Sequence, residues 1–448
     1  MIEKYNSVYI IGIGGISLSA IALILQAKGI KVYGSDLTNS NIIDNLIKKG
    51  INVIIGHCKE FVKVSDAVIY TSAIADDDCD LLYAKKLNKP TFSRAEILGE
   101  ISVGYRTISI AGAHGKTTAT GMISSVFLNA ECHPFVHIGG ILNNISSNVL
   151  IGKDDVFITE ACEYKDSFLS LRSFVSVILN IKPDHLDYFK NIDNEFKSFQ
   201  KYVDNTTNRG VVVLNADDEL SKKITTDKKI ITFAIKNKKA DILAKNILEY
   251  EKGKFSFDVK VKDEEINIKL PCYGFHNIYN ALATISVCSF FDINLQKIKE
   301  GLEGFKGIKR RFEYINTINN NVIIHDYAHH PEEIEAVIKT GKEISDKLIV
   351  VFQPHTFTRT RDLYDEFLTC FDNADEVWLL PIYPAREKAI KGVTSFNLAQ
   401  NLKKHGKNVK YFSNFTKCRD KIIKMKNKNY LIEILGAGDI EHLADLLK

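Results

Sequence analysis

The segment SIAGAHGKTTATGM carries the residue types of a phosphate-binding loop. Gly112 and Gly115 would let successive backbone N–H groups converge on phosphate oxygens. Lys116 would reach the β and γ phosphates of a nucleotide, and Thr117 would ligate magnesium. The usual signature needs one more glycine, five residues before Gly115, and Ile110 stands there. The segment predicts a nucleotide site, and the alternative is a tight turn with a solvated lysine.

Two side chains further along the chain favour the nucleotide site. Glu160 ends the apolar run VFITE, and His185 follows the next apolar run, in LNIKPDHLDYF. Ligands of open α/β sheets gather at the carboxyl ends of the strands, so both side chains are expected at that edge. A carboxylate and an imidazole could join Thr117 in holding magnesium beside a triphosphate. Taken singly, each residue has the alternative of an ordinary solvated or hydrogen-bonded side chain.

A second glycine turn, Gly12-Ile13-Gly14-Gly15, follows a β-rich run and precedes a helical pattern. Asp36 ends the next β-rich run, where a dinucleotide-binding fold places an acid. Ser17 occupies the position of the third fingerprint glycine, which weakens the case for NAD. The amides of a helix N-terminus attract any diphosphate, so the turn predicts a Rossmann-like unit with an anion site. Glycines that only permit a tight turn are the alternative.

Alternating strand and helix patterns must position these residues. The length of 448 residues suggests about three domains, and the alternation of apolar runs with helical patterns predicts parallel sheets. We therefore predict an α/β fold with a Rossmann-like domain at 1–104, a central P-loop ATPase-type domain at 105–307 and a C-terminal Rossmann-like α/β domain at 308–448. A hairpin is expected at 255–270.

The composition excludes several classes of protein. Apolar residues make up 45% and charged residues 25%, with a net charge of +4 and no clustered basic segment, so nucleic-acid binding is not expected. The eight cysteines contain no C-x-x-C, which argues against a zinc cage and a disulfide framework and for a reducing compartment. We find no signal peptide, and the longest apolar run, 16–27, is shorter than a membrane span. A cytoplasmic protein without membrane insertion is expected.

Eight sequence blocks occur in a familiar order between Gly12 and Ile440. They are AGAHGKTT, EACEYKDSF, NIKPDHLDYF, GFHNIYNALA, KRRFE, DYAHHP, FQPHTFTRTRDL and GAGDI. In sequence and spacing these blocks resemble the Mur ligases of peptidoglycan synthesis. The loop of that family looks like G-x-x-G-K-[ST]-[ST] and does not need the glycine that is absent at Ile110.

The resemblance implies an ATP-dependent ligase with Mg²⁺ as cofactor. It would join L-alanine to the lactyl carboxylate of UDP-N-acetylmuramate through an acyl phosphate. The N-terminal domain would hold the UDP end of the sugar nucleotide and the central domain ATP. The C-terminal domain would close over ATP and the amino acid. The oligomeric state stays open between a monomer and a homodimer.

The resemblance also assigns roles to residues of this sequence. ATP would contact Gly112, Ala113, His114, Gly115, Lys116, Thr117, Thr118, His276, Asn277, Asn280, Arg311 and Asp326. The sugar nucleotide and amino acid would contact Gly14, Gly15, Asp36, Tyr327, His329, His355 and Arg359. Thr117 and Glu160 would hold one magnesium and His185 a second. Lys116, Glu160, His185, His329 and Arg359 would serve catalysis.

Some positions depart from the family pattern. Thr356 stands where many relatives have Arg, which puts one phosphate or carboxylate contact in doubt. His325 replaces a common acid before Asp326, and EACEYKD replaces the more common EADESD. Some members of the superfamily carry a carbamylated lysine near magnesium, and Lys201 lies in roughly that region.

Four rival functions are weighed against this interpretation. A sister ligase that attaches a recycled tripeptide to the same sugar nucleotide shares the blocks. A folate-polyglutamate ligase has no reason for HDYAHHP and FQPH together. An NAD-dependent oxidoreductase would rest on the first glycine turn and Asp36 alone, and would leave Lys116 without a role. A regulatory nucleotide-binding protein would keep the phosphate loop but would not need an amino-acid pocket.

Overall fold

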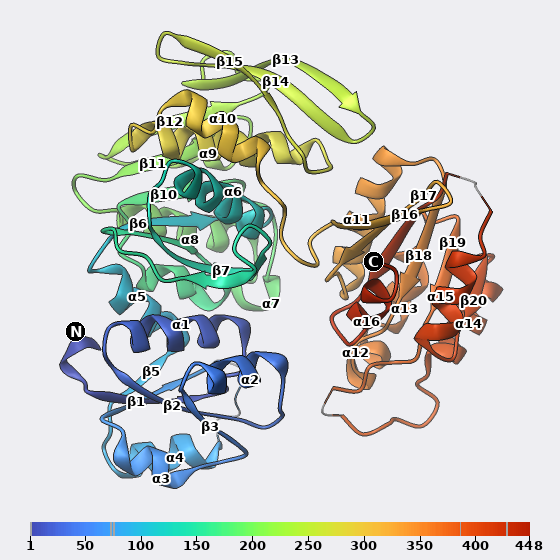
Figure 1. The fold of residues 1–448 in the computed structure, drawn as a ribbon, viewed down its shortest axis with the longest axis horizontal. Coiled ribbons are helices and arrows are strands. Elements are labelled where there is room, and N and C mark those ends of the chain that lie inside the picture. The colour runs from blue at the N-terminus through green and yellow to red at the C-terminus, as the bar shows by residue number, and fades with distance from the viewer. Residues whose placement is uncertain (1, 72–73, 75–76, 386, 427–428) are drawn as a thin grey trace. The chain divides into compact units, whose positions relative to one another are not determined.

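The computed structural model describes residues 2–71, 74, 77–385, 387–426 and 429–448 (Figure 1). Its contacts divide the chain into two compact units. One unit comprises residues 1–248 and 255–306, and the other comprises 249–254 and 307–448. Three sheets follow one another along the chain, the first two largely within the first unit. The exact domain boundaries at 104/105 and 307/308 remain predictions.

The first sheet is fully parallel, as the alternating pattern predicts, with the strand order β3-β2-β1-β4-β5. Helices connect the strands, because parallel neighbours need a crossover. The elements are η1 (Ile2–Lys4), β1 (Ser7–Ile11), α1 (Ile16–Ala27), β2 (Lys31–Asp36), α2 (Asn41–Lys48), β3 (Asn52–Ile55), α3 (Lys59–Val64), β4 (Ala67–Tyr70), α4 (Cys79–Lys86), β5 (Thr91–Ser93) and α5 (Arg94–Ser102).

The second sheet has ten strands, in the order β15-β14-β13-β12-β11-β10-β6-β9-β7-β8. The predicted hairpin is present as the antiparallel pair β14–β15. A further antiparallel pair, β7–β8, has no counterpart in the prediction. The elements are β6 (Arg106–Ala111), α6 (Lys116–Asn129), β7 (Phe135–Leu142), β8 (Ser147–Leu150), β9 (Val156–Glu160), η2 (Tyr164–Ser170), β10 (Val175–Ile178), α7 (Leu186–Phe189), α8 (Ile192–Asp204), β11 (Val211–Asn215), η3 (Ser221–Lys223), β12 (Lys229–Ala234), β13 (Ile242–Glu251), β14 (Lys254–Val261), β15 (Glu264–Lys269), α9 (His276–Phe290) and α10 (Leu295–Glu303).

The third sheet has the order β16-β17-β21-β18-β19-β20 and is parallel except for the edge pair β16–β17. The sequences of its central strands are continuously apolar, because helices cover both faces of a parallel sheet and bury every side chain of the strand. The elements are β16 (Glu313–Ile318), β17 (Asn321–Asp326), α11 (Pro331–Ile344), β18 (Leu348–Phe352), α12 (Phe357–Asp362), α13 (Tyr364–Thr369), β19 (Glu376–Leu379), α14 (Ser395–Lys404), β20 (Val409–Tyr411), α15 (Phe415–Ile423), β21 (Leu431–Leu435) and α16 (Glu441–Asp445).

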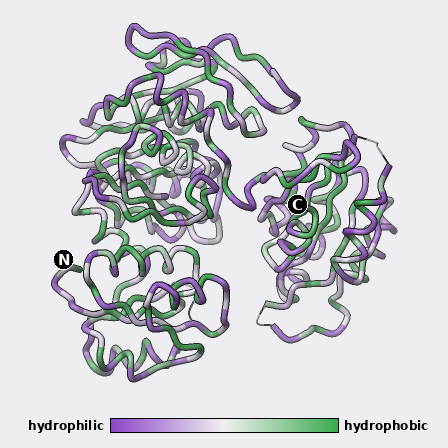
Figure 2. Tube along the Cα trace, in the orientation of Figure 1, coloured by the Kyte–Doolittle hydropathy of each residue, from purple (hydrophilic) through white to green (hydrophobic). Residues whose placement is uncertain are grey.

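Within the first unit, one apolar core joins the first two sheets. Helix α1 packs against β7 and β8, and residues such as Ile21 and Phe157 belong to the same buried cluster. Hydrophobic and hydrophilic stretches alternate along the tube in Figure 2. Accordingly, among the described residues we find no helix with the length and apolar character that a bilayer crossing requires.

Candidate functional site

The phosphate loop connects the end of β6 at Ala111 to the start of α6 at Lys116. Gly112 and Gly115 have φ angles of 141° and 90°, a backbone conformation that favours glycine. A Cβ atom at Gly115 would lie 2.6 Å from Asn280 Oδ1 of α9. The second glycine is therefore needed both for the turn and for the close approach of α9 to the loop.

Lys116 turns back over the loop. Its ammonium group donates hydrogen bonds to the carbonyl oxygen of Gly112 at 2.6 Å and to Glu163 Oε1 at 2.9 Å. Glu163 is fully buried, and its Oε2 atom has no hydrogen-bond partner among the described residues. A buried carboxylate is costly unless a cation compensates it, so the ion pair fixes the lysine at the loop.

Glu163 also belongs to a group of potential metal ligands with Asp184 and His185. One ligand atom from each lies within 4.8 Å of the others. His185 Nε2 is 3.9 Å from Glu163 Oε1, and His185 Nδ1 is 3.7 Å from Asp184 Oδ1. Both separations exceed a hydrogen bond, so the His185 ring lies between the two carboxylates without bonding directly to either. Carboxylate oxygens are the usual ligands of Mg²⁺.

Glu195 of α8 contacts this group through the backbone of Asp184. Its Oε2 atom accepts a hydrogen bond from the Asp184 backbone N–H at 3.2 Å, and its buried Oε1 atom has no partner within the part of the chain that the structure describes. Burial raises the pKa of Glu195 to about 7, and the neighbouring Asp184 and Glu163 carboxylates act in the same direction. Sequence reasoning missed Glu163, Asp184 and Glu195, although Glu163 follows the predicted Glu160 by three residues and Asp184 precedes His185.

The other predicted metal ligands lie outside this group. Thr117 is buried in the first turn of α6. Glu160 ends β9, and its Oε1 atom accepts a hydrogen bond from the Gly139 N–H at 2.7 Å. The structure therefore brings His185 together with Glu163 and Asp184 and places Glu160 on a different set of contacts.

The remaining predicted nucleotide residues lie on the loop or at the start of α9. Ala113 is buried, His114 donates its N–H to Asn180 Oδ1 at 3.0 Å, and Thr118 is half-buried in α6. Asn277 and Asn280 are buried and hydrogen-bonded to each other at 2.8 Å. His276 is exposed at the helix start.

Asp36 contacts the N-terminal glycine turn. Gly14 donates its N–H to Asp36 Oδ2 at 3.1 Å, and a Cβ atom at Gly14 would lie 2.9 Å from the same oxygen. Gly15 is the N-cap of α1. The carboxylate of Asp36 therefore holds the turn in place, and this structural role stands beside the predicted one in substrate binding.

Ser17, which replaces the third fingerprint glycine, connects the first sheet to the second. Its hydroxyl is 2.8 Å from His137 Nε2, and His137 Nδ1 is 3.0 Å from the Thr159 hydroxyl. Burial lowers the pKa of His137 to about 3, so the ring is neutral. Since Thr159 precedes Glu160, the chain of contacts leads from the glycine turn to the end of β9.

In the second unit, Asp326 ends β17 and is buried. Its two carboxylate oxygens accept the backbone N–H groups of Phe312 at 2.7 Å and Ala328 at 2.8 Å. Burial raises the pKa of Asp326, whereas the nearby Arg311 guanidinium opposes the shift. Arg311 itself is exposed.

Four predicted substrate residues of the second unit form one aromatic and cationic cluster. The ring of His329 lies 5.2 Å from that of Tyr327 and 5.6 Å from that of His355. A guanidinium nitrogen of Arg359 is 3.2 Å from His355 Nδ1. Burial lowers the pKa of His355 to about 4, and His329 and Arg359 add to the shift, so the imidazole is neutral near pH 7.

The structure also locates the departures from the family pattern. Thr356 has a φ angle of 69° and caps α12 through its side chain, which accepts the Arg359 N–H. His325 is buried in β17, and burial lowers its pKa to about 3. Lys201, at the end of α8, is exposed.

Comparisons with known proteins cover nearly the whole chain. Residues 7–106 match the Mur ligase family catalytic domain, 110–288 the Mur ligase middle domain and 310–438 the Mur ligase glutamate ligase domain. The UDP-N-acetylmuramate–L-alanine ligase of Acetivibrio thermocellus is 42% identical over 99% of this chain and 96% of its own. The enzyme of that name from Clostridium botulinum strain Alaska E43 is 43% identical, over 98% and 96%.

A solved structure agrees with these relatives. The crystal structure of the UDP-N-acetylmuramate-alanine ligase of Thermotoga maritima matches with a TM-score of 0.80 and 28% identity, over 98% of this chain and 97% of that one. The match confirms the predicted three-domain α/β fold. With three consecutive family domains and relatives above 40% identity over almost their full length, the chain belongs to the Mur ligase family.

Proposed function

We propose that this chain is an ATP-dependent ligase that joins L-alanine to the lactyl carboxylate of UDP-N-acetylmuramate in peptidoglycan precursor synthesis. The observation that carries the proposal is the identity of 42% to a UDP-N-acetylmuramate–L-alanine ligase over 96% of that enzyme's length. Such a reaction takes small-molecule substrates, and we place it in the cytoplasm, where ATP is available.

The reaction has two steps. Transfer of the γ-phosphoryl group of ATP to a lactyl carboxylate oxygen forms an acyl phosphate and ADP. The alanine amine then attacks the carbonyl carbon, so that a C–N bond forms, the C–O bond to phosphate breaks and the amine loses a proton. The N–H groups of the loop and Lys116 would stabilise the phosphoryl oxygens during transfer.

Mg²⁺ fits the residues that are present. The partnerless buried oxygen of Glu163, together with Asp184 and His185, offers a set of hard oxygen donors and one imidazole. Thr117 and Glu160 remain the candidates for a second ion. Bound Mg²⁺ would neutralise charge on the phosphate oxygens.

Substrate binding by the C-terminal cluster is part of the proposal. The neutral His329 and His355 rings can donate or accept hydrogen bonds, and Arg359 can pair with a carboxylate. These groups would orient the amino acid and stabilise the oxyanion of the tetrahedral intermediate.

A substrate matrix tests the function. Phosphate release is followed with Mg-ATP and UDP-N-acetylmuramate plus L-alanine, glycine, L-serine, D-glutamate or the recycled tripeptide. We expect L-alanine to be best and glycine and serine to react more slowly, because one methylene changes binding by only about 1–3 kcal/mol. D-glutamate should fail, since its carboxylate needs a cation and extra volume. A better rate with the tripeptide would assign the sister reaction instead, and no phosphate release with any amine would refute a ligase.

A further inference from the structure

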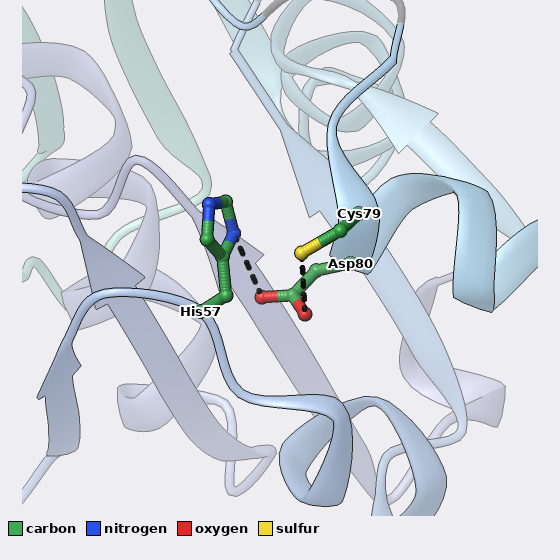
Figure 3. A group of neighbouring side chains, drawn as sticks. All are labelled: His57, Cys79 and Asp80. Carbon is green, nitrogen blue, oxygen red and sulfur yellow. Dashed lines mark hydrogen bonds and ion pairs between the residues drawn. The ribbon is translucent and has the colours of Figure 1, made fainter.

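Three potential metal ligands from two separate parts of the sequence meet in the first sheet's domain. His57 follows β3, and Cys79 and Asp80 begin α4 (Figure 3). One ligand atom from each lies within 4.8 Å of the others. We propose that His57, Cys79 and Asp80 bind a zinc ion. The site uses none of the residues assigned to the ligase reaction.

The separations of these side chains are compatible with a bound metal. His57 Nδ1 is 3.6 Å from Asp80 Oδ2, and Cys79 Sγ is 3.9 Å from Asp80 Oδ1. An N–H···O hydrogen bond would measure about 2.7–3.2 Å, so the imidazole and the carboxylate are not directly bonded. Zinc bonds of about 2.0–2.3 Å in a tetrahedron give ligand separations of about 3.3–3.8 Å. In Figure 3 the His57 imidazole and the Cys79 thiol each face the Asp80 carboxylate, and one ligand atom from each residue lies within 4.8 Å of the others.

Asp80 is the anchor of the site. Its side chain is fully buried, and within the described part of the chain the one basic group at ion-pair distance is the half-exposed His57. A buried carboxylate normally pairs with a cation or coordinates a metal. Asp80 Oδ2 accepts hydrogen bonds from the Tyr9 hydroxyl at 2.7 Å and the Cys58 N–H at 2.8 Å. These neutral partners orient the carboxylate as outer-shell groups of metal sites do, and they leave its charge uncompensated.

The surrounding charges attract a cation. Asp78, the N-cap of α4, places its Oδ2 atom 3.7 Å from His57 Nδ1 and could supply a further ligand. A thiol must lose its proton to ligate a metal, so Zn²⁺ binding by Cys79 would release a proton.

The ligand types select the metal. A thiolate, an imidazole and a carboxylate are the ligands of Zn²⁺, whereas Mg²⁺ prefers oxygen alone. Three protein ligands leave a coordination position for water or Asp78. The absence of C-x-x-C in the sequence argued against a zinc cage. The missing motif excludes only zinc sites built from closely spaced cysteines. In the proposed site His57 lies 22 residues before Cys79, so the motif is not required.

The test is a Co²⁺ titration of the chelator-treated full-length protein, because cobalt bound to a thiolate gives a charge-transfer band in the near ultraviolet. We expect a saturable band at about one equivalent that Zn²⁺ abolishes by displacement. Cys79→Ser should remove the band. His57→Asn should keep it but weaken Zn²⁺ binding at least about tenfold in calorimetry, and its exposed side chain makes misfolding a poor explanation. Tyr9→Phe should weaken binding about tenfold.

Two cysteine controls locate the metal. Cys162 lies beside Glu163 in the other group of potential ligands, and Cys132 lies in the loop after α6. Cys162→Ser and Cys132→Ser should leave the band and the Zn²⁺ affinity within about twofold of wild type. The proposal is overturned if wild type shows no saturable band, if Cys79→Ser retains it, or if Cys162→Ser is the variant that loses it. Circular dichroism spectra must match for all variants.

Discussion

Each compact unit holds one group of candidate functional side chains. The two groups differ in the sign of the charge that they offer to a ligand. Around Lys116 the buried groups are the acids Glu163 and Glu195, and one of them is already paired with the lysine. Around His355 the groups are imidazoles and the Arg359 guanidinium. The first group suits cations that accompany a phosphate, and the second suits anions.

Burial shifts the pKa of a titratable side chain in each group. It raises the pKa of Glu195 to about 7 and lowers that of His355 to about 4, so both shifts favour the uncharged form. Each unit thereby limits the charge that it must bury before its ligands bind. The comparison predicts that variants of the two groups fail in different ways.

The largest effect is expected for Lys116→Ala. Turnover should fall by about 10²–10³-fold, because a preorganised cation acts on the developing charge of the phosphoryl group. UDP-N-acetylmuramate binding, measured by calorimetry without ATP, should change little. Lys182→Ala is the matched control, since this exposed lysine also pairs with a buried acid, Asp218, at 3.1 Å. Near-normal turnover of Lys116→Ala would remove the phosphate-loop assignment.

Arg359→Ala should lower kcat/KM for alanine by about 100-fold, the loss of about 2–3 kcal/mol for a charge-assisted hydrogen bond. ATP-induced thermal stabilisation should persist. Arg361 lies in the same helix, α12, but is exposed and paired with Asp362, so Arg361→Ala should stay within about twofold of wild type. Equal losses in both variants would mean that α12 acts through general electrostatics and not through a specific contact.

Features of the site that involve residues close together in the sequence can be predicted, whereas contacts between residues far apart in the sequence cannot. The phosphate loop, the acid at the end of β2 and the end of β9 follow from local patterns of glycine and apolar residues. The pairing of Lys116 with Glu163 does not, because it joins residues 47 positions apart that meet only once β6 and β9 pair in the sheet.

Other contacts between segments far apart in the sequence are likewise not predictable from local patterns. Ser17 and His137 meet across 120 residues, and His57 meets Asp80 through the packing of α4 against α3. Strand β16 and its antiparallel pairing with β17 have no counterpart in the prediction. Sheet pairing decides these positions, and no single segment encodes it.

Glu163→Gln should raise the Mg²⁺ concentration for half-maximal activity by about tenfold, because the amide is a weaker ligand than the carboxylate and releases Lys116. Glu219→Gln, which removes an exposed carboxylate paired with Lys222, is the control and should leave the Mg²⁺ titration unchanged. If Glu163→Gln lowers turnover without moving the Mg²⁺ midpoint, Glu163 only positions the lysine and does not bind the metal.

The smallest expected effect is on the way protein stability depends on pH, and it should differ in sign between the two groups. The folded-state pKa of Glu195, about 7, lies above its ordinary value, so the folded protein binds more protons and loses stability as pH rises from 4.5 to 7. The folded-state pKa of His355, about 4, lies below its ordinary 6.5, so stability is lost as pH falls from 6.5 to 4. Melting temperatures of Glu195→Gln relative to wild type should therefore increase with rising pH, and those of His355→Gln with falling pH. Parallel curves for the two variants would show that the two groups do not differ in the way their charges are buried.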